Sequence, residues 1–235
     1  MSARKCLRKA PTGVPLAVLF LCLTHTGLEA QHCIGLPTAP GQTALEASIG
    51  FPDGGNILGV AVHHRPASGP FAVRGRFEHH TWYTEPAMNM NSLGSIGTYD
   101  LTREVVQVPG NLSFCATGGF MYGRLSSADS FLANIMEIPV GVALGGILRL
   151  GEADENGGGG LALIPWVAPA IYHSRESWEG GSMSSTDVDI ILGGTMLFDW
   201  FFASLDLQQI FRDSSAGSSV WCDRSYATLR FGLLF

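Results

Sequence analysis

Three residues near the end of one predicted strand could carry out acyl-transfer chemistry. His173 and Ser174 are adjacent, and Glu176 follows two positions later. A serine becomes a nucleophile when a histidine takes its proton and a carboxylate orients that histidine. Neighbouring residues of a strand point to opposite faces, so His173 and Ser174 would not meet on one side of a sheet. We therefore predict no catalytic residue here. A lipid-modifying enzyme is kept as an alternative, ranked third after the two that are given at the end of this section.

Two histidine pairs, His63-His64 and His79-His80, raise the question of metal binding. Adjacent strand residues cannot both face one ion, and the spacing of Cys and His fits no zinc site. The run of four glycines within 152–160 lacks the Lys-Ser/Thr ending of a phosphate-binding loop. We therefore predict no metal and no cofactor.

Charged residues instead recur at every second position of strand-like stretches. The stretch 71–83 has Phe71, Val73, Gly75 and Phe77 on one face and Ala72, Arg74, Arg76 and Glu78 on the other. Such alternation predicts a β-strand with one apolar face. It fits a soluble β-sandwich whose core is apolar, and equally a membrane barrel whose charges face the lumen. The pattern alone does not choose between the two.

The first 30 residues have the layout of a secretory signal peptide. Arg4, Lys5, Arg8 and Lys9 precede an apolar run over 14–23, and a cleavage region ends near Ala30. That run is too short to span a bilayer as a helix, and no later stretch has 18 consecutive apolar residues. We expect a signal peptide at 1–30, a periplasmic lead-in at 31–43 and one domain at 44–235.

Removal of residues 1–30 changes the charge of the chain markedly. The whole chain carries −6, and the removed segment carries four basic residues and one acidic residue, so the mature chain carries −9. The mature chain contains ten arginines and no lysine. Nucleic-acid binding relies on basic surfaces, so we predict no nucleic-acid partner.

Three cysteines remain after removal of residues 1–30. Cys33 and Cys115 would lie near one rim of the sheet, and Cys222 would lie in a loop at the other. The periplasm is oxidising, so one disulfide and one unpaired thiol are expected, with the pairing left open.

The last ten residues, 226–235, alternate again and end on an aromatic residue. The apolar face near the end consists of Leu229, Phe231, Leu233 and Phe235. Together with the signal peptide and the repeated strands of about ten residues, this end makes 44–235 resemble the small bacterial outer-membrane β-barrels, the OmpA-like and opacity-type group. The resemblance implies a bacterial outer-membrane location and a terminal strand that the barrel-insertion machinery reads as a signal. In lipid A deacylases of this membrane His and Ser fall two apart, unlike His173 and Ser174.

We predict an all-β, closed, antiparallel, up-and-down transmembrane barrel of ten strands, with eight as the alternative. The strands are expected at 44–51, 56–64, 71–83, 98–108, 111–125, 138–150, 161–173, 187–198, 201–210 and 226–235. Loops of about a dozen residues are expected at 84–97, 126–137, 174–186 and 211–225, facing outward, and short periplasmic turns at 65–70, 109–110 and 199–200. Pro165 and Pro169 predict a bulge or a shortened strand.

The predicted lumen mixes charges of both signs. Its members are Glu46, Arg74, Arg76, Glu78, Arg149, Asp187, Asp189, Asp206 and Arg230. Opposite charges across a narrow barrel would pair and fill it. We therefore predict a non-enzymatic integral protein with a closed or very narrow lumen and a structural or surface-contact role. Outer-membrane lipid is its expected partner, and a narrow channel for small solutes is the second alternative.

Overall fold

The computed structural model describes residues 33–36, 38–102, 112–127, 130–150, 160–211 and 225–235. The predicted signal peptide at 1–30 and Cys222 lie outside these ranges. Within them the chain is almost entirely strand, apart from one short 3-10 helix, η2 (Cys33–Gly35). No helix in these ranges has the length and apolar character needed to cross a bilayer.

The strands form one sheet that closes on itself. They are β1 (Thr43–Phe51), β2 (Gly55–His64), β3 (Phe71–Trp82), β4 (Met88–Asp100), β5 (Leu112–Ser127), β6 (Ser130–Gly146), β7 (Leu148–Leu150), β8 (Leu161–Trp178), β9 (Gly181–Phe198), β10 (Phe201–Phe211) and β11 (Tyr226–Leu234). Each pairs antiparallel with its neighbour, β1 pairs with β11, and both β6 and β7 pair with β8. Because β6 and β7 lie one after the other along β8, the wall has ten strands. The prediction of a closed ten-stranded antiparallel barrel is confirmed, and the eight-stranded alternative is wrong.

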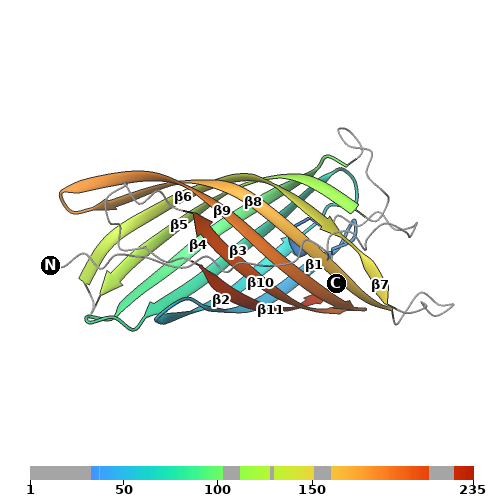
Figure 1. Ribbon diagram of the computed structural model, residues 1–235, viewed down its shortest axis with the longest axis horizontal. Helices are drawn as coiled ribbons and strands as arrows, with labels where there is room; N and C mark the ends of the chain where they lie inside the picture. Colours follow the sequence, from blue (N-terminus) through green and yellow to red (C-terminus); the bar gives the residue numbers. More distant parts are fainter. Residues whose placement is uncertain (1–32, 37, 103–111, 128–129, 151–159, 212–224) are drawn as a thin grey trace.

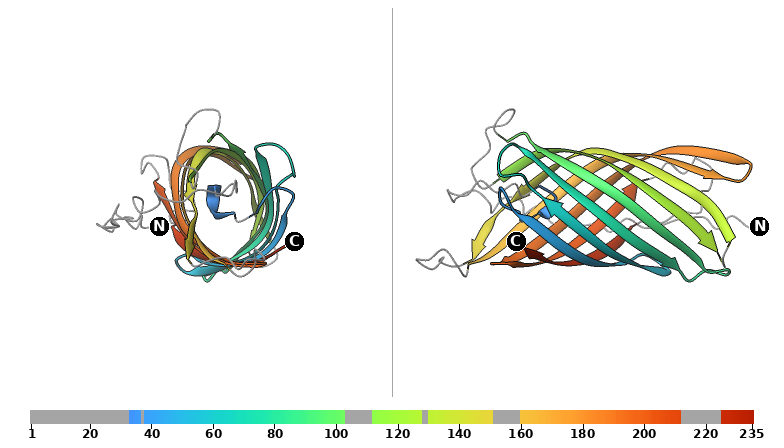
Figure 2. Two further views of the ribbon diagram at one scale, coloured as in Figure 1. Left: turned by 90° about the vertical axis from the view of Figure 1, so that its right-hand side faces the viewer. Right: turned by 180° about the vertical axis from the view of Figure 1, so that it is seen from behind.

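Figure 1 shows the strands inclined steeply to the long axis, and the end view in Figure 2 shows them as a ring with η2 inside it. The first and last strands meet where Thr43 and Phe235 exchange two backbone hydrogen bonds of 3.1 and 2.8 Å. We call this the terminal end of the barrel and the opposite end, with the turn between β8 and β9, the distal end.

Three of the loops predicted at the distal end are wrong, because the chain there is mostly strand. The range predicted as loop at 84–97 belongs largely to β4, so the strand predicted at 98–108 begins ten residues earlier, at Met88. The loop predicted at 174–186 is the tip of the β8–β9 hairpin, which stays paired as far as Trp178 and Gly181. The range 126–137 is shared between β5 and β6. The fourth predicted loop, 211–225, lies mostly outside the described residues.

The prolines of β8 neither shorten it nor shift its register, which corrects the prediction of a bulge or a shortened strand. β8 runs without interruption over 18 residues. Its pairing with β6 stops at Gly141 with Ala170 and resumes at Leu144 with Val167, so it skips the stretch that contains Pro169. A proline has no N–H to donate to a ladder, and the neighbouring pairs hold the strand in place.

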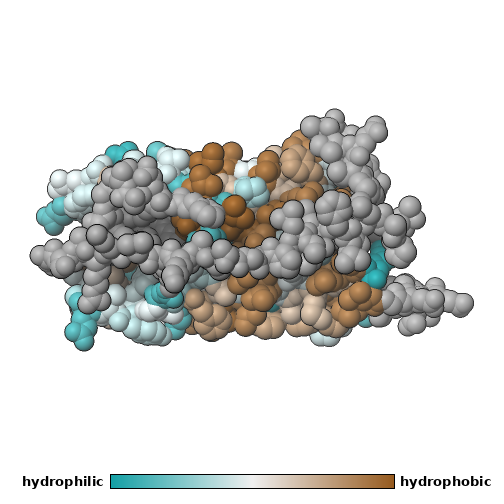
Figure 3. All heavy atoms as spheres, viewed as in Figure 1, coloured by the Kyte–Doolittle hydropathy of each residue, from teal (hydrophilic) through white to brown (hydrophobic). Residues whose placement is uncertain are grey.

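The polarity of the wall is opposite to that of a soluble protein. Val60, in the middle of β2, is 57% exposed on the outer face, whereas Arg230 is 2% exposed inside. The other exposed apolar residues of the outer face include Leu45, Leu58, Val62, Phe77, Leu93, Phe120, Val140, Ile171, Val188, Leu205, Leu207, Phe231 and Leu233. Together they form an apolar belt around the barrel. On the face seen in Figure 3 the middle of the barrel is apolar, and the distal end beyond it is polar.

Candidate functional site

A buried ion network lies along the inner wall of the barrel and is centred on Glu46 of β1. Its carboxylate accepts a hydrogen bond from Arg74 of β3 and lies 2.9 Å from Nε2 of His63 of β2. Nη1 of Arg230 of β11 lies 3.4 Å from Glu46 Oε2. One carboxylate therefore ties together four neighbouring strands on both sides of the place where the first strand meets the last.

Arg230 extends this network to β10. Its Nη2 donates to Asp206 Oδ1 at 2.9 Å and to Ser204 Oγ at 3.0 Å. Its guanidinium also lies 5.7 Å from the ring centroid of Trp166, within the range of a cation–π contact. A guanidinium has five donors in a fixed plane, and these contacts use several of them at once.

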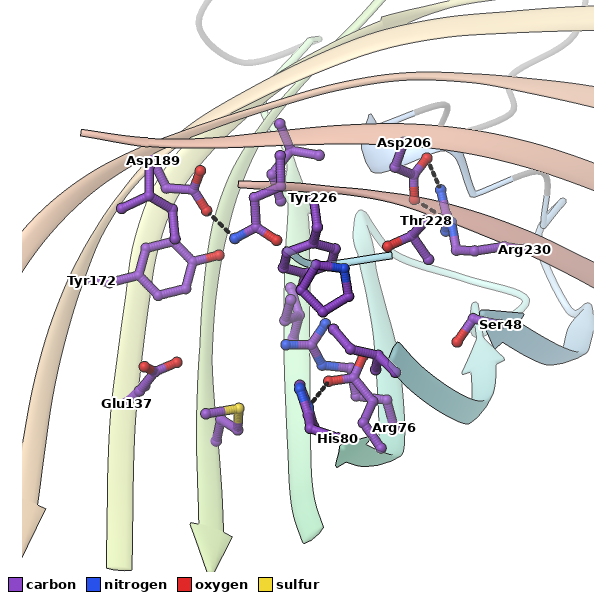
Figure 4. Close-up of a pocket in the computed structure, with 18 of the residues that line it drawn as sticks. Ser48, Arg76, His80, Glu137, Tyr172, Asp189, Asp206, Tyr226, Thr228 and Arg230 are labelled. Carbon is purple, nitrogen blue, oxygen red and sulfur yellow. Dashed lines mark hydrogen bonds and ion pairs between the residues drawn. The ribbon is translucent and has the colours of Figure 1, made fainter. Parts of the chain in front are cut away.

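A second polar group lies closer to the distal end. Arg76 Nη1 and His80 Nε2 each lie 3.4 Å from an oxygen of Glu78, and the His80 ring stacks on Trp82 at 5.5 Å between ring centroids. On the opposite wall Gln208 donates a hydrogen bond to Asp189. Figure 4 shows Arg76, His80 and Asp189 of these residues, with Tyr172 and Tyr226, pointing into the lumen.

The structure places eight of the nine predicted lumen residues inside the barrel. Glu46, Arg74, Asp206 and Arg230 share one network. Arg76 and Glu78 form the second group, and Asp187 and Asp189 line the wall opposite them. The exception is Arg149, which is exposed on the short strand β7 at the terminal end and joins neither group.

Part of the segment predicted as a periplasmic lead-in at 31–43 lies inside the barrel. Cys33, Ile34, Gly35 and Leu36, which we call the plug, are all buried within the terminal end of the lumen. Cys33 forms a disulfide with Cys115 of β5, so the pairing that the sequence left open is Cys33–Cys115. The apolar side chains of the plug pack against Ala143, Trp166 and Ala168.

A glycine allows the plug to lie against the inner wall. Gly35 has a φ of +67°, a left-handed conformation that favours glycine, and a Cβ there would lie 2.3 Å from Trp166 Nε1. Its carbonyl accepts a hydrogen bond of 2.9 Å from Thr195 Oγ1 of β9. The plug is therefore held by a disulfide, a hydrogen bond and close packing.

We expect Gly35→Ala to loosen the plug, because the new methyl group has no room and the backbone is strained. We expect the free energy of local opening of the plug to fall by over about 1.4 kcal/mol. A small thiol should then reduce the disulfide of the folded barrel in detergent at least about tenfold faster. Mass spectrometry after alkylation measures that rate.

Gly41→Ala is the matched control. Gly41 also has a positive φ, +82°, but a Cβ there would meet no atom closer than 3.6 Å. The Gly41→Ala substitution therefore adds backbone strain without a steric clash, and Gly41 lies outside the packed plug. Equal acceleration in both variants would show that Gly35 does not position the plug.

A cavity of about 140 Å³ lies between the plug and the distal end. It touches Ile34 of the plug, passes Arg74, Asp206 and Arg230, and reaches Trp82 and Ile210 near the distal end. The ion network thus lines this cavity without dividing it, and the plug forms its floor.

The residues considered for catalysis are separated by the wall. The His173 side chain is exposed outside, with Nδ1 3.2 Å from Thr186 Oγ1, while Ser174 and Glu176 are 2% and 9% exposed inside. The histidine pairs are split in the same way, with His63 and His80 inside. Among the described residues no cluster of three or more His, Cys, Asp or Glu could hold a metal ion.

Sequence reasoning missed the plug and Trp166, which lies beneath it. The plug is only four residues long and has no period that predicts an element. The signal that could have identified it is the apolar run Cys33-Ile34-Gly35-Leu36 in an otherwise turn-rich segment, with a cysteine able to reach the wall.

No known family model matches the chain, and no curated protein matches it. Among solved structures, the N-terminal β-barrel domain of Pseudomonas aeruginosa OprF is 14% identical, with a TM-score of 0.35, and the match covers 84% of this chain and 100% of that chain. The translocator domain of the autotransporter NalP from Neisseria meningitidis is 12% identical, with a TM-score of 0.39, over 84% of this chain and 89% of that one. The KdgM porin is 10% identical, with a TM-score of 0.33, over 82% and 98%. Similarities this low carry no argument about function.

Proposed function

We propose that this protein is a non-enzymatic integral β-barrel of the bacterial outer membrane, with a lumen closed by its own plug and a structural or surface-contact role. The observation that carries the proposal is the reversed polarity of the wall, with Val60 57% exposed outside and Arg230 2% exposed inside. Apolar residues facing outward around a closed barrel require lipid as their solvent.

The terminal end is proposed to face the periplasm and the distal end the exterior. With ten strands, both ends of the barrel domain lie on one side. Phe231, Leu233 and Phe235 are exposed on the outer face of the terminal end. Together with Leu229 they are proposed as the strand that the barrel-insertion machinery reads.

An arginine placed in the apolar belt tests whether lipid surrounds it. We expect Val60→Arg to lower the free energy of unfolding by about 2–4 kcal/mol in vesicles, because the guanidinium would sit at the middle of the bilayer. Urea titration of the barrel refolded in lipid vesicles measures this change, with the unheated, fast-migrating gel band as the folded signal.

Asn56→Arg is the matched control on the same strand and face. Asn56 lies at the distal edge of the belt, where the same substitution should cost no more than about 1 kcal/mol. If both variants unfold at the urea concentration of the wild type, or if the protein shows no heat-dependent change in migration, the membrane proposal is wrong.

A narrow channel is the second candidate, and the cavity that runs from the plug toward the distal end favours it. Conductance in a planar bilayer distinguishes the two candidates. A barrel closed by its plug carries no current, whereas a narrow channel does.

A further inference from the structure

A row of polar residues marks the distal edge of the apolar belt on the outer face. His79, Asn91, Arg124, Asn134 and Ser177 are successive partners across β3, β4, β5, β6 and β8. The next outward positions toward the terminal end include Phe77, Leu93 and Tyr122, exposed by 45%, 64% and 45%. The outer face therefore changes from apolar to polar within one step along β3, β4 and β5. On β8 it stays polar for two further steps toward the terminal end, through Arg175 and His173.

Two arginines lie at this edge on either side of β6. Arg124 of β5 pairs with Asn134, and Arg175 of β8 pairs with Met136, two residues along the same strand and face. Two strand spacings and this offset place their Cα atoms about 12 Å apart. Both side chains are exposed on the outer face. They thus form one basic pair at the distal edge of the belt, with Arg175 one step nearer the terminal end than Arg124.

Neither arginine has an acidic partner among the described residues. The contact that the structure gives Arg124 is with an aromatic ring, its guanidinium lying 5.4 Å from the ring centroid of Phe131. The other arginines of the described ranges lie in the lumen (Arg74, Arg76, Arg230) or at the terminal end (Arg65, Arg149). Within the described part of the chain, these two neighbouring guanidiniums have no carboxylate beside them, which leaves both open to an anion from outside.

We propose that Arg124 and Arg175 bind the phosphate groups of a phosphorylated glycolipid of the outer leaflet. A guanidinium binds phosphate through two parallel hydrogen bonds, which a lysine cannot do. The surface below the pair is apolar, with Tyr122, Ile138 and Ile171 exposed, so the acyl chains of the same molecule can lie against it. The continuity of the two surfaces favours a lipid over free phosphate. This inference rests on the proposed membrane function.

The test measures binding of diphosphoryl lipid A to the folded barrel in detergent by native mass spectrometry. Arg124→Gln with Arg175→Gln is expected to weaken binding at least tenfold, and each single change about threefold. Dephosphorylated lipid A should bind the wild type as weakly as diphosphoryl lipid A binds the double variant. An excess of inorganic phosphate should not displace the lipid.

Arg149→Gln is the matched control, because it removes an exposed arginine from the terminal end without touching the pair. Its affinity should equal that of the wild type. The inference is overturned if the double variant binds like the wild type, if both lipids bind equally well, if Arg149→Gln loses as much affinity, or if inorganic phosphate displaces the lipid. Every variant must show the heat-dependent migration of the wild type, so a failure here is separate from a failure of the membrane proposal.

Discussion

A chain that begins at Gln42 and carries Cys115→Ser is expected to pass ions through a planar bilayer, whereas the mature chain with its plug is expected to be silent. The cavity touches Ile34 at the terminal end and reaches Trp82 and Ile210 toward the distal end. The plug supplies its floor. Removing that floor should join the cavity to the solvent at the terminal end and produce discrete single-channel steps.

The Cys33→Ser and Cys115→Ser double variant separates the covalent bond from the plug itself. Ile34 and Leu36 would still pack against Trp166, and Thr195 would still donate to Gly35. We expect this variant to open only briefly, because the plug must leave its packed site each time. A silent chain beginning at Gln42 would show that something other than the plug closes the lumen.

Glu46→Gln is expected to lower the free energy of unfolding by roughly 3–5 kcal/mol, the largest effect of any single substitution considered. Glu46 is 4% exposed and lies against Arg74, Arg230 and His63. Removing one carboxylate leaves buried guanidinium groups without a full partner, which costs far more than an exposed ion pair contributes. Urea titration followed by the heat-dependent gel shift gives the value.

Two variants make this test specific. Glu179→Gln removes the same charge from the exposed turn between β8 and β9 and should leave the urea midpoint within experimental error. Glu46→Gln combined with Arg74→Gln should recover part of the loss, because Arg74 no longer needs that carboxylate. A midpoint for Glu46→Gln equal to that of Glu179→Gln would contradict the role given to the network.

The strands that cross the apolar belt could be predicted, because there the side chains must alternate. In β3 the apolar residues Phe77 and Val73 face outward while Arg74 and Glu78 face inward, as the alternation indicated. The bounds of β1, β2, β10 and β11 agree with prediction to within one residue for the same reason. The outward face of a strand in the belt is apolar at every second residue, so such a strand can be recognised from the sequence.

The distal extension of the β8–β9 hairpin could not be predicted, because both faces there are polar. Around the tip of the β8–β9 hairpin, Ser182 and Ser184 alternate with Met183 and Ser185, and no apolar face remains. The backbone ladder continues because its hydrogen bonds do not depend on the side chains. The partners of Glu46 could not be predicted either. They lie on neighbouring strands, and these strands come together only when the barrel closes.

The disulfide places a limit on the order in which the barrel is assembled. Cys33 and Cys115 are 1% and 0% exposed in the closed barrel, and 82 residues separate them. A thiol oxidase of protein size would not reach sulfur atoms this deeply buried in the closed barrel. We therefore expect the bond to be made while the sheet is still open, before β6 meets β8 and β1 meets β11. β1 to β4 and the first residues of β5 would then lie within a covalently closed loop, with the plug attached, before the barrel closes around them.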